Sequence, residues 1–443
     1  MAASELPVIL ENACRGVGPK RKDLNTCVHC GLCLNACPTY RELGLEADSP
    51  RGRVYQMIQV LEGRAQIDES YQSHIDLCLA CRACESACPS GVPYGRLVEA
   101  ARAEIDTVIR RPFLERAISG FVFGKVLPSK AWLKALSIPL RIYQTSGIET
   151  LVKKTGILSK FPRLAGLATL SPRVQSPSFF AQYGKTFAPE GERRYRVAML
   201  GGCMANVCFA RLHEATVRVL QWNGCEVVVP PNQTCCGALH LHAGRKKEAQ
   251  RLARQNVDAL LDGGFDAIIT NTAGCGCALK EYHELLEDAP AYAERAHAFS
   301  GKVKDVSEFL NSIGFRPPTR EVNALVTYQD SCHLTHGQKL PGPPRKLLQS
   351  IPGIRFREMP FSDHCCGSAG IYNVLHTDMS MRLLRKKMAN ANSTEAEIIT
   401  SANPGCLLQL EAGVRLHGNG QRVMHVIELL DEAYGGKEGL PQA

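Results

Sequence analysis

The chain has few aromatic residues and no long apolar run. Aromatic side chains make up 6% of its 443 residues, and no stretch of 18 or more apolar residues occurs. We therefore expect no membrane-spanning helix. Nucleic-acid binding is disfavoured despite a formal net charge of +9, because aromatics are sparse and no reader motif is present. The first ten residues carry Glu5 and no basic start before an apolar run, so no signal peptide is expected.

Motifs of several enzyme classes are absent as well. Gly201-Gly202 follows an apolar segment but does not form G-x-G-x-x-G, and no glycine-rich turn is followed by a Walker lysine. The chain contains neither a nucleophile elbow nor H-E-x-x-H. These absences argue against a site for a hydride-donating cofactor, a phosphate-binding loop, a serine nucleophile and a protease-type zinc site.

Cysteine, in contrast, is abundant, with 20 residues. Eight of them form two runs of the pattern C-x-x-C-x-x-C-x-x-x-C-P, which are Cys27, Cys30, Cys33 and Cys37-Pro38, and Cys78, Cys81, Cys84 and Cys88-Pro89. In two-cluster ferredoxins the fourth cysteine of such a run ligates the other cluster. We therefore predict two [4Fe–4S] clusters, one held by Cys27, Cys30, Cys33 and Cys88 and the other by Cys78, Cys81, Cys84 and Cys37.

Structural zinc is the main alternative for these runs, since C-x-x-C pairs also suit tetrahedral Zn²⁺. A zinc site takes four ligands from two separated knuckles and has no role for a third cysteine at the same spacing. Two such runs therefore favour iron–sulfur electron transfer. Reduced cysteines and oxygen-sensitive clusters indicate a cytoplasmic protein.

The positive charge is concentrated in one segment. Between Arg110 and Arg194 the chain carries fifteen Lys and Arg residues and four Glu residues, a local balance of +11 that leaves −2 for the rest. We expect prolines, Pro139 among them, to break residues 111–194 into short helical pieces. The segment is a candidate for contact with anionic lipid at the inner membrane or with an acidic partner. The alternatives are packing against the chain's own domains and an ordinary solvated surface.

Helical periodicity surrounds the cysteine runs. Residues 54–61 and 94–109 both show the apolar spacing of a helix that faces a core. Forty residues separate Cys37 from Cys78, so we predict a helical two-cluster domain rather than a small bacterial ferredoxin. The apolar residues that share one face of the second helix are Leu97, Val98, Ala101 and Ile105.

The remainder of the chain is an internal repeat. Each copy contains a strand that leads to a cysteine, a strand followed by Cys-Cys-Gly and a strand followed by Gly-Cys, with helices between them. The matching cysteine intervals are 32 and 39 residues in the first copy and 33 and 40 in the second. Alternating strands and helices predict a parallel sheet in each copy, with ligands beyond the carboxyl ends of the strands. The predicted strands are 197–200, 226–229, 267–270, 324–328, 354–358 and 398–400.

The repeats supply a second set of candidate metal ligands. These are Cys203, Cys235, Cys236 and Cys275 in the first copy, and Cys332, Cys365, Cys366 and Cys406 in the second. Adjacent cysteines diverge and can reach two metal atoms from one loop, and the glycine that follows them relieves backbone crowding. Burial as reduced thiols is the alternative, which we prefer only for the isolated Cys14, Cys208 and Cys225. Ligation or tuning of a cluster is the alternative to hydrogen-bonded or surface roles, which we expect, for His240, His242, His333, His364, Asp330 and Asp363.

Several longer segments carry a family resemblance. They are Cys27-Val28-His29-Cys30-Gly31, Pro50-Arg51-Gly52-Arg53, Cys78-Leu79-Ala80-Cys81-Arg82-Ala83-Cys84, Pro89-Ser90-Gly91-Val92, Ala273-Gly274-Cys275-Gly276, Lys280-Glu281-Tyr282 and Cys365-Cys366-Gly367-Ser368-Ala369-Gly370. With these segments the whole chain resembles the iron–sulfur subunits of bacterial glycolate oxidase (glycolate dehydrogenase). Its components are shared more broadly with lactate-utilisation iron–sulfur proteins, the anaerobic glycerol-3-phosphate dehydrogenase C subunit and heterodisulfide reductase.

The resemblance implies an α+β multidomain fold, in which an α-helical two-cluster ferredoxin domain precedes two α/β cysteine-rich (CCG) domains. The predicted boundaries are 1–110 for the cluster domain, 111–194 for a basic linker, and 195–320 and 321–443 for the repeats. It further implies that FAD-binding partner subunits oxidise glycolate to glyoxylate. This chain would pass the electrons toward a quinone and contain no catalytic residue of its own.

One feature of the repeats departs from heterodisulfide-reductase-like proteins, in which each repeat ends in C-x-x-C. Here Ala278 and Gln409 occupy the last position. A single shared cluster, two clusters or a zinc ion are therefore all open for the repeats. L-lactate or glycerol-3-phosphate is the alternative source of electrons. A cluster-based redox sensor or scaffold is the alternative of a different class, although eight cross-ligating cysteines favour conduction over sensing.

Overall fold

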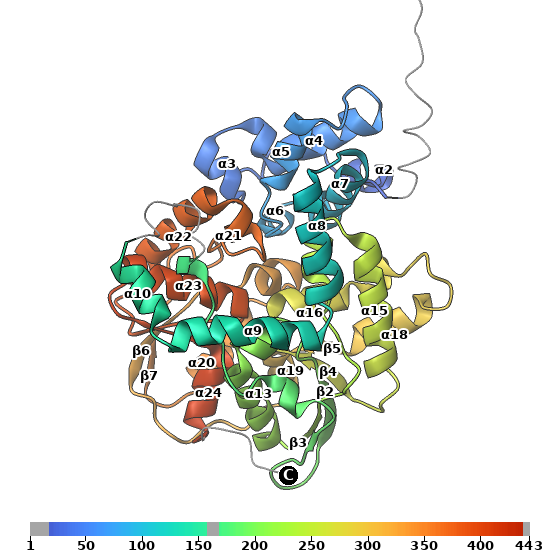
Figure 1. The fold of residues 1–443 in the computed structure, drawn as a ribbon. Helices are drawn as coiled ribbons and strands as arrows, with labels where there is room; N and C mark the ends of the chain where they lie inside the picture. Colours follow the sequence, from blue (N-terminus) through green and yellow to red (C-terminus); the bar gives the residue numbers. More distant parts are fainter. Residues whose placement is uncertain (1–16, 157–167, 437–443) are drawn as a thin grey trace, which may run out of the picture. The chain divides into compact units, whose positions relative to one another are not determined.

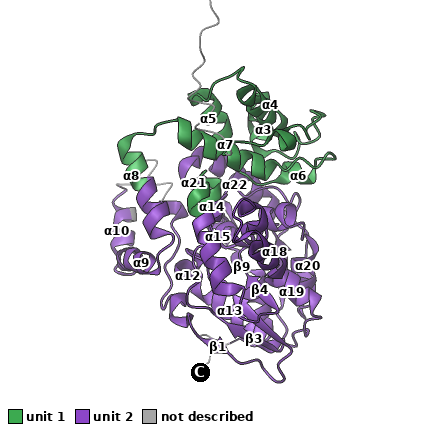
Figure 2. Ribbon diagram, turned by 90° about the vertical axis from the view of Figure 1, so that its right-hand side faces the viewer, with its two compact units in different colours: residues 1–118, 239–249 green, residues 119–238, 250–443 purple. Residues whose placement is uncertain are grey.

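The computed structural model describes residues 17–156 and 168–436 (Figure 1). Its contacts divide the chain into two compact units, residues 1–118 with 239–249 and residues 119–238 with 250–443 (Figure 2). None of the helices within the described ranges is both long enough and apolar enough to cross a bilayer. Cys14 and the segment considered for a signal peptide lie outside the described residues.

The first unit is built from helices around one core. Ser49 caps α4 by accepting a hydrogen bond from Gly52 N at 2.9 Å, and Pro50 begins the helix, where its missing N–H costs nothing. The predicted face of α7 is confirmed, because its four apolar residues are all at most 1% exposed. The helices are α2 (Arg21–Leu24), α3 (Pro38–Leu43), η1 (Glu46–Asp48), α4 (Pro50–Leu61), α5 (Glu69–Asp76), α6 (Ala83–Ser86), α7 (Tyr94–Val108) and, from later in the chain, α14 (Ala238–His242).

Residues 239–249 join this first unit through contacts with α7. Arg102 Nη1 donates a hydrogen bond to the backbone oxygen of His242 at 2.9 Å. The Nδ1 atom of the same histidine lies 2.9 Å from Glu99 Oε1. The charged face of α7 therefore holds a segment that follows the first Cys-Cys-Gly loop in the sequence, while its apolar face packs in the core.

The second unit contains two sheets of matching topology. In the first sheet the order is β1-β3-β2-β4-β5, and in the second it is β7-β6-β8-β9. All neighbours are parallel except β1, which pairs antiparallel with β3 at the edge. Both repeats thus place their strands in the order second, first, third, fourth. The strands are β1 (Thr186–Phe187), β2 (Tyr195–Met199), β3 (Cys225–Val228), β4 (Ala267–Thr270), β5 (Val303–Asp305), β6 (Ala324–Tyr328), β7 (Ile354–Phe356), β8 (Ile398–Ser401) and β9 (Arg422–His425).

The six strands predicted for the repeats are present, with small shifts at their ends, and each sheet adds a fourth parallel strand. Both added strands lead into a capped helix. Asp305 caps α19 in a capping box with Glu308, and His425 caps α24 in a capping box with Glu428. The main helices of the repeats are α13 (Ala210–Trp222), α15 (Lys246–Leu260), α16 (Ala273–Lys280), α18 (Ala293–Lys302), α19 (Val306–Ser312), α20 (Gly342–Gln349), α22 (Thr377–Asn392), α23 (Pro404–His417) and α24 (Val426–Ala433).

The two repeats pack against each other through equivalent helices. Helix α13 of the first contacts α24 of the second, and α19 of the first contacts α20 of the second. Arg218 on α13 forms an ion pair with Asp431 on α24, with Nη2 2.6 Å from Oδ2. Asn311 on α19 donates a hydrogen bond to the backbone oxygen of Pro343 on α20 at 3.1 Å. Exchanging the repeats exchanges these two contacts, which is the pattern of a local two-fold arrangement.

The basic segment contains a longer helix than we predicted from its prolines. Helix α9 (Lys130–Thr145) continues through Pro139, so the break expected there is wrong. A proline in a helix removes one hydrogen bond and bends the axis but need not end it when both flanks are held. Ser129 caps the start of α9, and Gln144 near its end bonds the backbone oxygen of Pro172 at 2.8 Å. The other helical pieces are α8 (Phe113–Phe121), η2 (Val122–Val126) and α10 (Ile148–Lys154).

Candidate iron–sulfur sites

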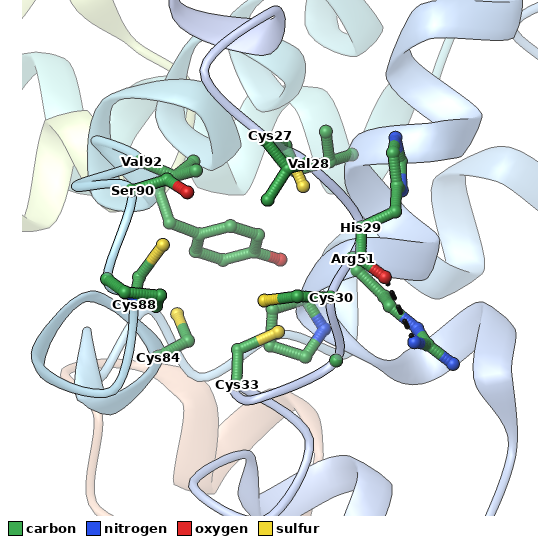
Figure 3. Close-up of a pocket in the computed structure, with 15 residues that line it drawn as sticks. Cys27, Val28, His29, Cys30, Cys33, Arg51, Cys84, Cys88, Ser90 and Val92 are labelled. Carbon is green, nitrogen blue, oxygen red and sulfur yellow. Dashed lines mark hydrogen bonds between the residues drawn. The ribbon is translucent and has the colours of Figure 1, made fainter.

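Two cavities of the first unit are lined by the cysteines of the two N-terminal runs. The first, which we call cavity 1, has a volume of about 420 Å³ with its opening, and cavity 2 has about 290 Å³. Each is bordered by the four cysteines that the sequence predicts for one cluster, and Cys84 borders both. Figure 3 shows the cavity 1 side chains, which come from the loop after α2, from the start of α4 and from the facing segment around Cys88. The lining cysteines are Cys27, Cys30, Cys33, Cys84 and Cys88 for cavity 1, and Cys37, Cys78, Cys81 and Cys84 for cavity 2.

The two ligand loops have the same unusual backbone conformation. Positive φ angles occur two and four residues after the first cysteine of each run, at His29 (53°) and Gly31 (84°) and again at Ala80 (50°) and Arg82 (63°). A residue other than glycine pays roughly 1–2 kcal/mol for this conformation. The bend turns backbone N–H groups toward sulfur, since Ala80 N donates to Cys78 Sγ at 3.4 Å. Both loops are thus shaped around their sulfur atoms.

The segment Pro50-Arg51-Gly52-Arg53 lies between the cavities at the start of α4. Pro50 lines both cavities, whereas Arg51 lines only cavity 1 and Arg53 only cavity 2. Gly52 is required by close approach, because a Cβ at this position would lie 1.9 Å from the backbone oxygen of Glu46. The shared motif of the sequence therefore has a separate structural role for each of its residues.

Burial controls the protonation of these thiols. It raises the pKa of Cys27 and of Cys33, while the backbone N–H of His29 acts in the opposite direction on Cys27. The pKa of Cys84 is raised well above its ordinary value, first by burial and then by the neighbouring thiols. A metal that binds here must displace protons, so loading of the cavities will depend on pH.

In the second unit, the cysteines of each repeat form a connected group of four, here called quartet 1 and quartet 2. In quartet 1 the Sγ atoms of Cys236 and Cys275 lie 3.0 Å apart. Cys235 is hydrogen-bonded to both Cys203 and Cys236, which completes the chain of contacts. Quartet 2 repeats the pattern with Cys332, Cys365, Cys366 and Cys406, each bonded to the next. All eight residues are buried except Cys275 and Cys332, which are half-buried.

Sheet topology explains why each quartet assembles. In a parallel sheet with this strand order, the chain runs outward in opposite directions from the adjacent first and third strands. Ligands bind at the carboxyl ends of these two strands. Cys203 and Cys275 follow the first and third strands of the first repeat, β2 and β4, and Cys332 and Cys406 follow β6 and β8 of the second. The Cys-Cys-Gly loops close the sites from the side. Gly367 has φ of 92°, and a Cβ there would lie 2.6 Å from the backbone oxygen of Ser380.

One amide side chain links the ligand-bearing segments of the two repeats. Asn403 Nδ2 donates to Cys406 Sγ in its own repeat at 3.4 Å. Its Oδ1 accepts a hydrogen bond at 3.4 Å from Gly274 N, the residue before Cys275 in the other repeat. The quartets therefore face the same boundary between the repeats.

The polar residues beside the cysteines are engaged elsewhere, as expected for Asp330 and His242. Both carboxylate oxygens of Asp330 accept from Arg345, at 2.8 and 2.7 Å, and His242 lies against Glu99. The isolated Cys208 and Cys225 are buried, at 5% and 0% exposure. Arg53 was identified only as part of the motif Pro50-Arg51-Gly52-Arg53, and Lys387 was not predicted at all. Lys387 is buried and donates to the backbone oxygens of Phe361 and Ser362 beside quartet 2. A charged residue inside an otherwise apolar helical face was the available signal for Lys387.

The donor set of the first unit fits iron–sulfur clusters. Each cavity has at least four cysteines among its lining residues, and cysteine sulfur is the ligand type that cubane clusters use. In the quartets four sulfurs also converge, and their donors suit iron–sulfur or zinc alike. Within the described residues, no three Cys, His, Asp or Glu side chains are arranged to hold a single metal ion. The ligand assignments therefore stay predictions, and the repeats keep all three alternatives.

Comparison with protein families accounts for most of the chain. Residues 23–92 match the "4Fe-4S dicluster domain", which contains both cysteine runs. Residues 114–170 match the "Glycolate oxidase iron-sulfur subunit, linker region", which covers part of the basic segment. Residues 197–280 and 326–411 both match the "Cysteine-rich domain" CCG, and each match contains one quartet. The predicted fold class, a two-cluster domain followed by two CCG repeats, is confirmed.

Relatives with known names match along nearly the whole length. The probable glycolate oxidase iron–sulfur subunit of Bacillus subtilis is 42% identical over 421 residues, which cover 94% of this chain and 95% of the relative. The glycolate oxidase iron–sulfur subunit of Escherichia coli is 33% identical over 93% of this chain and 94% of its own length. Lactate utilization protein A of Oceanobacillus iheyensis is 29% identical over 53% of this chain and 96% of the relative. The chain belongs to the glycolate oxidase iron–sulfur subunit family.

Proposed function

We propose that this chain is the electron-transfer subunit of a glycolate dehydrogenase complex, in which FAD-binding partner subunits oxidise glycolate to glyoxylate. The observation that supports this most strongly is the pair of adjacent cavities, one bordered by five cysteines and the other by four, which share Pro50, Cys84 and Tyr94 as common walls. The names of its two full-length relatives supply the substrate. Cavity 1 would hold one [4Fe–4S] cluster on Cys27, Cys30, Cys33 and Cys88, and cavity 2 the other on Cys37, Cys78, Cys81 and Cys84.

The electron balance suits two clusters. Glycolate loses two electrons and two protons when it becomes glyoxylate, and a quinone that takes up both becomes a quinol. The clusters would supply one-electron carriers between the flavin and the quinone. The chain's own residues hold the carriers close together and keep water away, since Tyr94 is 3% and Cys84 7% exposed.

The surface beside cavity 1 is suited to contact with a partner subunit. Val28 and Leu32, on the loop that carries Cys27, Cys30 and Cys33, are 67% and 61% exposed. Apolar side chains exposed beside a redox site are typical of protein docking surfaces. We assign the electron exchange with the flavoprotein to this loop. The quartets would hold either a further iron–sulfur cluster, which would extend the relay, or a zinc ion, which carries no electrons and would be structural.

We propose that α9 places the complex on the cytoplasmic surface of the inner membrane. The helix has no acidic residue, and four large apolar side chains on it, Trp132, Leu136, Ile138 and Ile142, are between 43% and 60% exposed. Leu133 on the opposite side is buried, and Lys130 lies 4.4 Å from the centre of the Tyr183 ring. An apolar helix face within a basic segment matches anionic lipid and brings the carriers near a membrane quinone.

Vesicle binding tests the membrane contact. The intact complex is mixed with vesicles of phosphatidylcholine alone or with one third phosphatidylglycerol, and sedimented. We expect binding to the anionic vesicles, and at least a tenfold loss in the double variant Ile138→Gln/Ile142→Gln. Leu416→Gln, which changes an exposed leucine on α23 (45% accessible), should bind normally. Equal binding by the double variant and the unchanged complex would exclude α9 as the contact.

Electron transfer is tested in the anaerobically co-purified complex. In Cys84→Ser we expect loss of cluster signal and of glycolate-dependent quinone reduction, while glycolate still reduces the flavin of the partner. Cys208→Ser, a buried cysteine far along the chain from both runs, serves as the matched control. Normal quinone reduction by Cys84→Ser would refute the ligand assignment. Reduction of the clusters by L-lactate or glycerol-3-phosphate but not by glycolate would identify the alternative dehydrogenase. If none of the three substrates reduces the clusters, a redox sensor is favoured.

A further inference from the structure

The two cavities differ in the positive charge beside them. Arg51 at cavity 1 is partly exposed, with 31% of its side chain accessible, and forms an ion pair with Glu46 at 2.7 Å. Arg53 at cavity 2 has a side chain that is 0% exposed. Arg82 also lines cavity 2, but its charge is paired with Glu85 at 2.9 Å. The buried guanidinium of Arg53 is therefore the distinguishing charge of cavity 2.

A set of hydrogen bonds orients this guanidinium toward the cavity. Its Nε donates to the backbone oxygen of His74 at 2.6 Å, and both Nη atoms donate to Thr39 Oγ1 at 3.2 Å. Thr39 Oγ1 lies in turn 3.2 Å from Cys37 Sγ, a predicted ligand of the second cluster. One hydroxyl group thus separates the charge of Arg53 from the sulfur.

The counter-charge is held away from the cavity. Asp48 Oδ1 lies 3.4 Å from Arg53 Nη2 and 2.9 Å from His74 Nδ1, and Asp48 is not one of the residues that line cavity 2. The pair is therefore a dipole with its positive end at the cavity. Burial opposes the charge of Arg53, but Tyr94, Cys78, Cys37 and Asp48 together raise its pKa above the ordinary value, so the group stays charged.

We propose that Arg53 makes the cluster of cavity 2 the more easily reduced of the two. The proposal rests on the proposed ligand assignment. Reduction adds one electron and no proton, so the cluster gains one negative charge. A buried cation stabilises that charge strongly because little solvent screens it, whereas Arg51 is screened by water and by Glu46. Electrons that enter at cavity 1 would therefore come to rest at cavity 2.

The start of α4 accounts for the placement of one arginine at each cavity. Because Gly52 fixes the start of α4 against Glu46, the two arginines leave the helix on either side of Pro50. The partly exposed Arg51 reaches cavity 1, and the buried Arg53 reaches cavity 2. The motif Pro50-Arg51-Gly52-Arg53 would thereby set a difference in reduction potential between two otherwise similar four-cysteine sites.

A redox titration followed by electron paramagnetic resonance tests the proposal on the intact complex. We expect Arg53→Gln to lower the reduction equilibrium constant of one cluster at least tenfold, which is 59 mV for one electron. Arg53→Lys keeps the charge and should restore most of the difference. Asp48→Asn removes the counter-charge and should shift the same cluster in the opposite direction. Arg51→Gln, the matched control at cavity 1, should change either cluster less than threefold.

The outcomes separate this proposal from the proposed function. Opposite shifts in Arg53→Gln and Asp48→Asn support a role for charge, because a merely structural defect would move both variants the same way. Changes of less than twofold in both variants would overturn it while leaving two working clusters. If Arg53→Gln loses its clusters, Asp48→Asn decides alone, and an unchanged potential there refutes the proposal. Absence of two cluster signals from the unmodified chain would refute the ligand assignment and this proposal together.

Discussion

Replacement of Gly52 by alanine tests whether the start of α4 is held by close packing. The φ angle of Gly52 is not positive, so an alanine could adopt its backbone conformation. Its Cβ would, however, lie 1.9 Å from the backbone oxygen of Glu46 and 2.8 Å from its carbon, whereas real Cβ contacts are at least 3.0 Å. A backbone carbonyl cannot rotate away as a flexible side chain can. The first turn of α4 must therefore move by about 1 Å or more.

Three effects decide the free energy of unfolding. Alanine in place of glycine stabilises a helix by about 1 kcal/mol. Overpacking costs about 2 kcal/mol, within the usual range of about 1–3. Displacement of Gly52 N from Ser49 Oγ, now at 2.9 Å, removes a helix cap worth about 1 kcal/mol. The clash and the lost cap outweigh the gain in propensity, so we expect Gly52→Ala to lose about 2 kcal/mol.

The consequence for the sites should exceed the effect on stability. Pro50, Arg51 and Arg53 move with the first turn, and they line the two cavities. We therefore expect Gly52→Ala to bind less iron per chain and to have a lower unfolding midpoint after anaerobic purification. Gly120→Ala is the matched control, because a Cβ at this position in α8 meets nothing within 4 Å, and it should be neutral or slightly stabilising. An unchanged iron content with an equal or higher midpoint in Gly52→Ala would refute the packing argument.

Two further predictions concern the second unit. Burial raises the pKa of Asp305 from 3.8 to about 6. Below pH 3.8 this carboxyl is protonated in both the folded and the unfolded state and does not lower the free energy of unfolding; as the pH rises through 6 that stability is lost, because the unfolded state releases the proton more readily. Asp305→Asn keeps a helix cap without this penalty, and denaturant unfolding should show a gain of up to about 3 kcal/mol at pH 7.5 that disappears near pH 4; an equal gain at both pH values would contradict the linkage. Arg218→Met leaves Asp431 buried and unpaired between the repeats and should cost about 3 kcal/mol in urea unfolding. The exposed pair of Arg355 and Glu397 gives the control, since Arg355→Met should cost less than about 1 kcal/mol, and equal losses in the two variants would mean that burial of the pair does not matter.

The parts of the fold that sequence predicted are those with local signals. Cysteine spacing identified both N-terminal runs, and strand-like segments of three to five residues identified the first three strands of each repeat. The fourth strands, β5 and β9, escaped because Val-Lys-Asp and Arg-Val-Met-His are short and polar. Only their parallel pairing with β4 and β8 makes them strands. Pro139 was wrongly expected to end a helix, because the contacts that hold α9 on both sides are not visible in the sequence.

The candidate site shows the same limit. The sequence identified the motif Pro50-Arg51-Gly52-Arg53 but not that its arginines border different cavities. It also gave no sign that Ala80 and Arg82 share the left-handed backbone of His29 and Gly31. A glycine in the sequence indicates that a positive φ angle is possible, whereas alanine and arginine adopt one only when the surrounding structure compensates the conformational energy. Tertiary packing therefore determines what spacing alone leaves undefined.

Duplication of the repeats preserves geometry more closely than electrostatics. Twenty residues after Cys236, Asn256 is fully buried and donates to the backbone oxygen of Cys235 at 3.0 Å. Twenty-one residues after Cys366, the helix in the second repeat carries Lys387, which is 2% exposed and bonds the backbone oxygens before its own Cys-Cys-Gly loop. Burial lowers the pKa of Lys387, and the thiols of quartet 2 act against that effect. The amide of Asn256 supports one Cys-Cys-Gly loop and the amine of Lys387 supports the other. The two quartets therefore offer the same four sulfur ligands but differ in the electrostatic field around them.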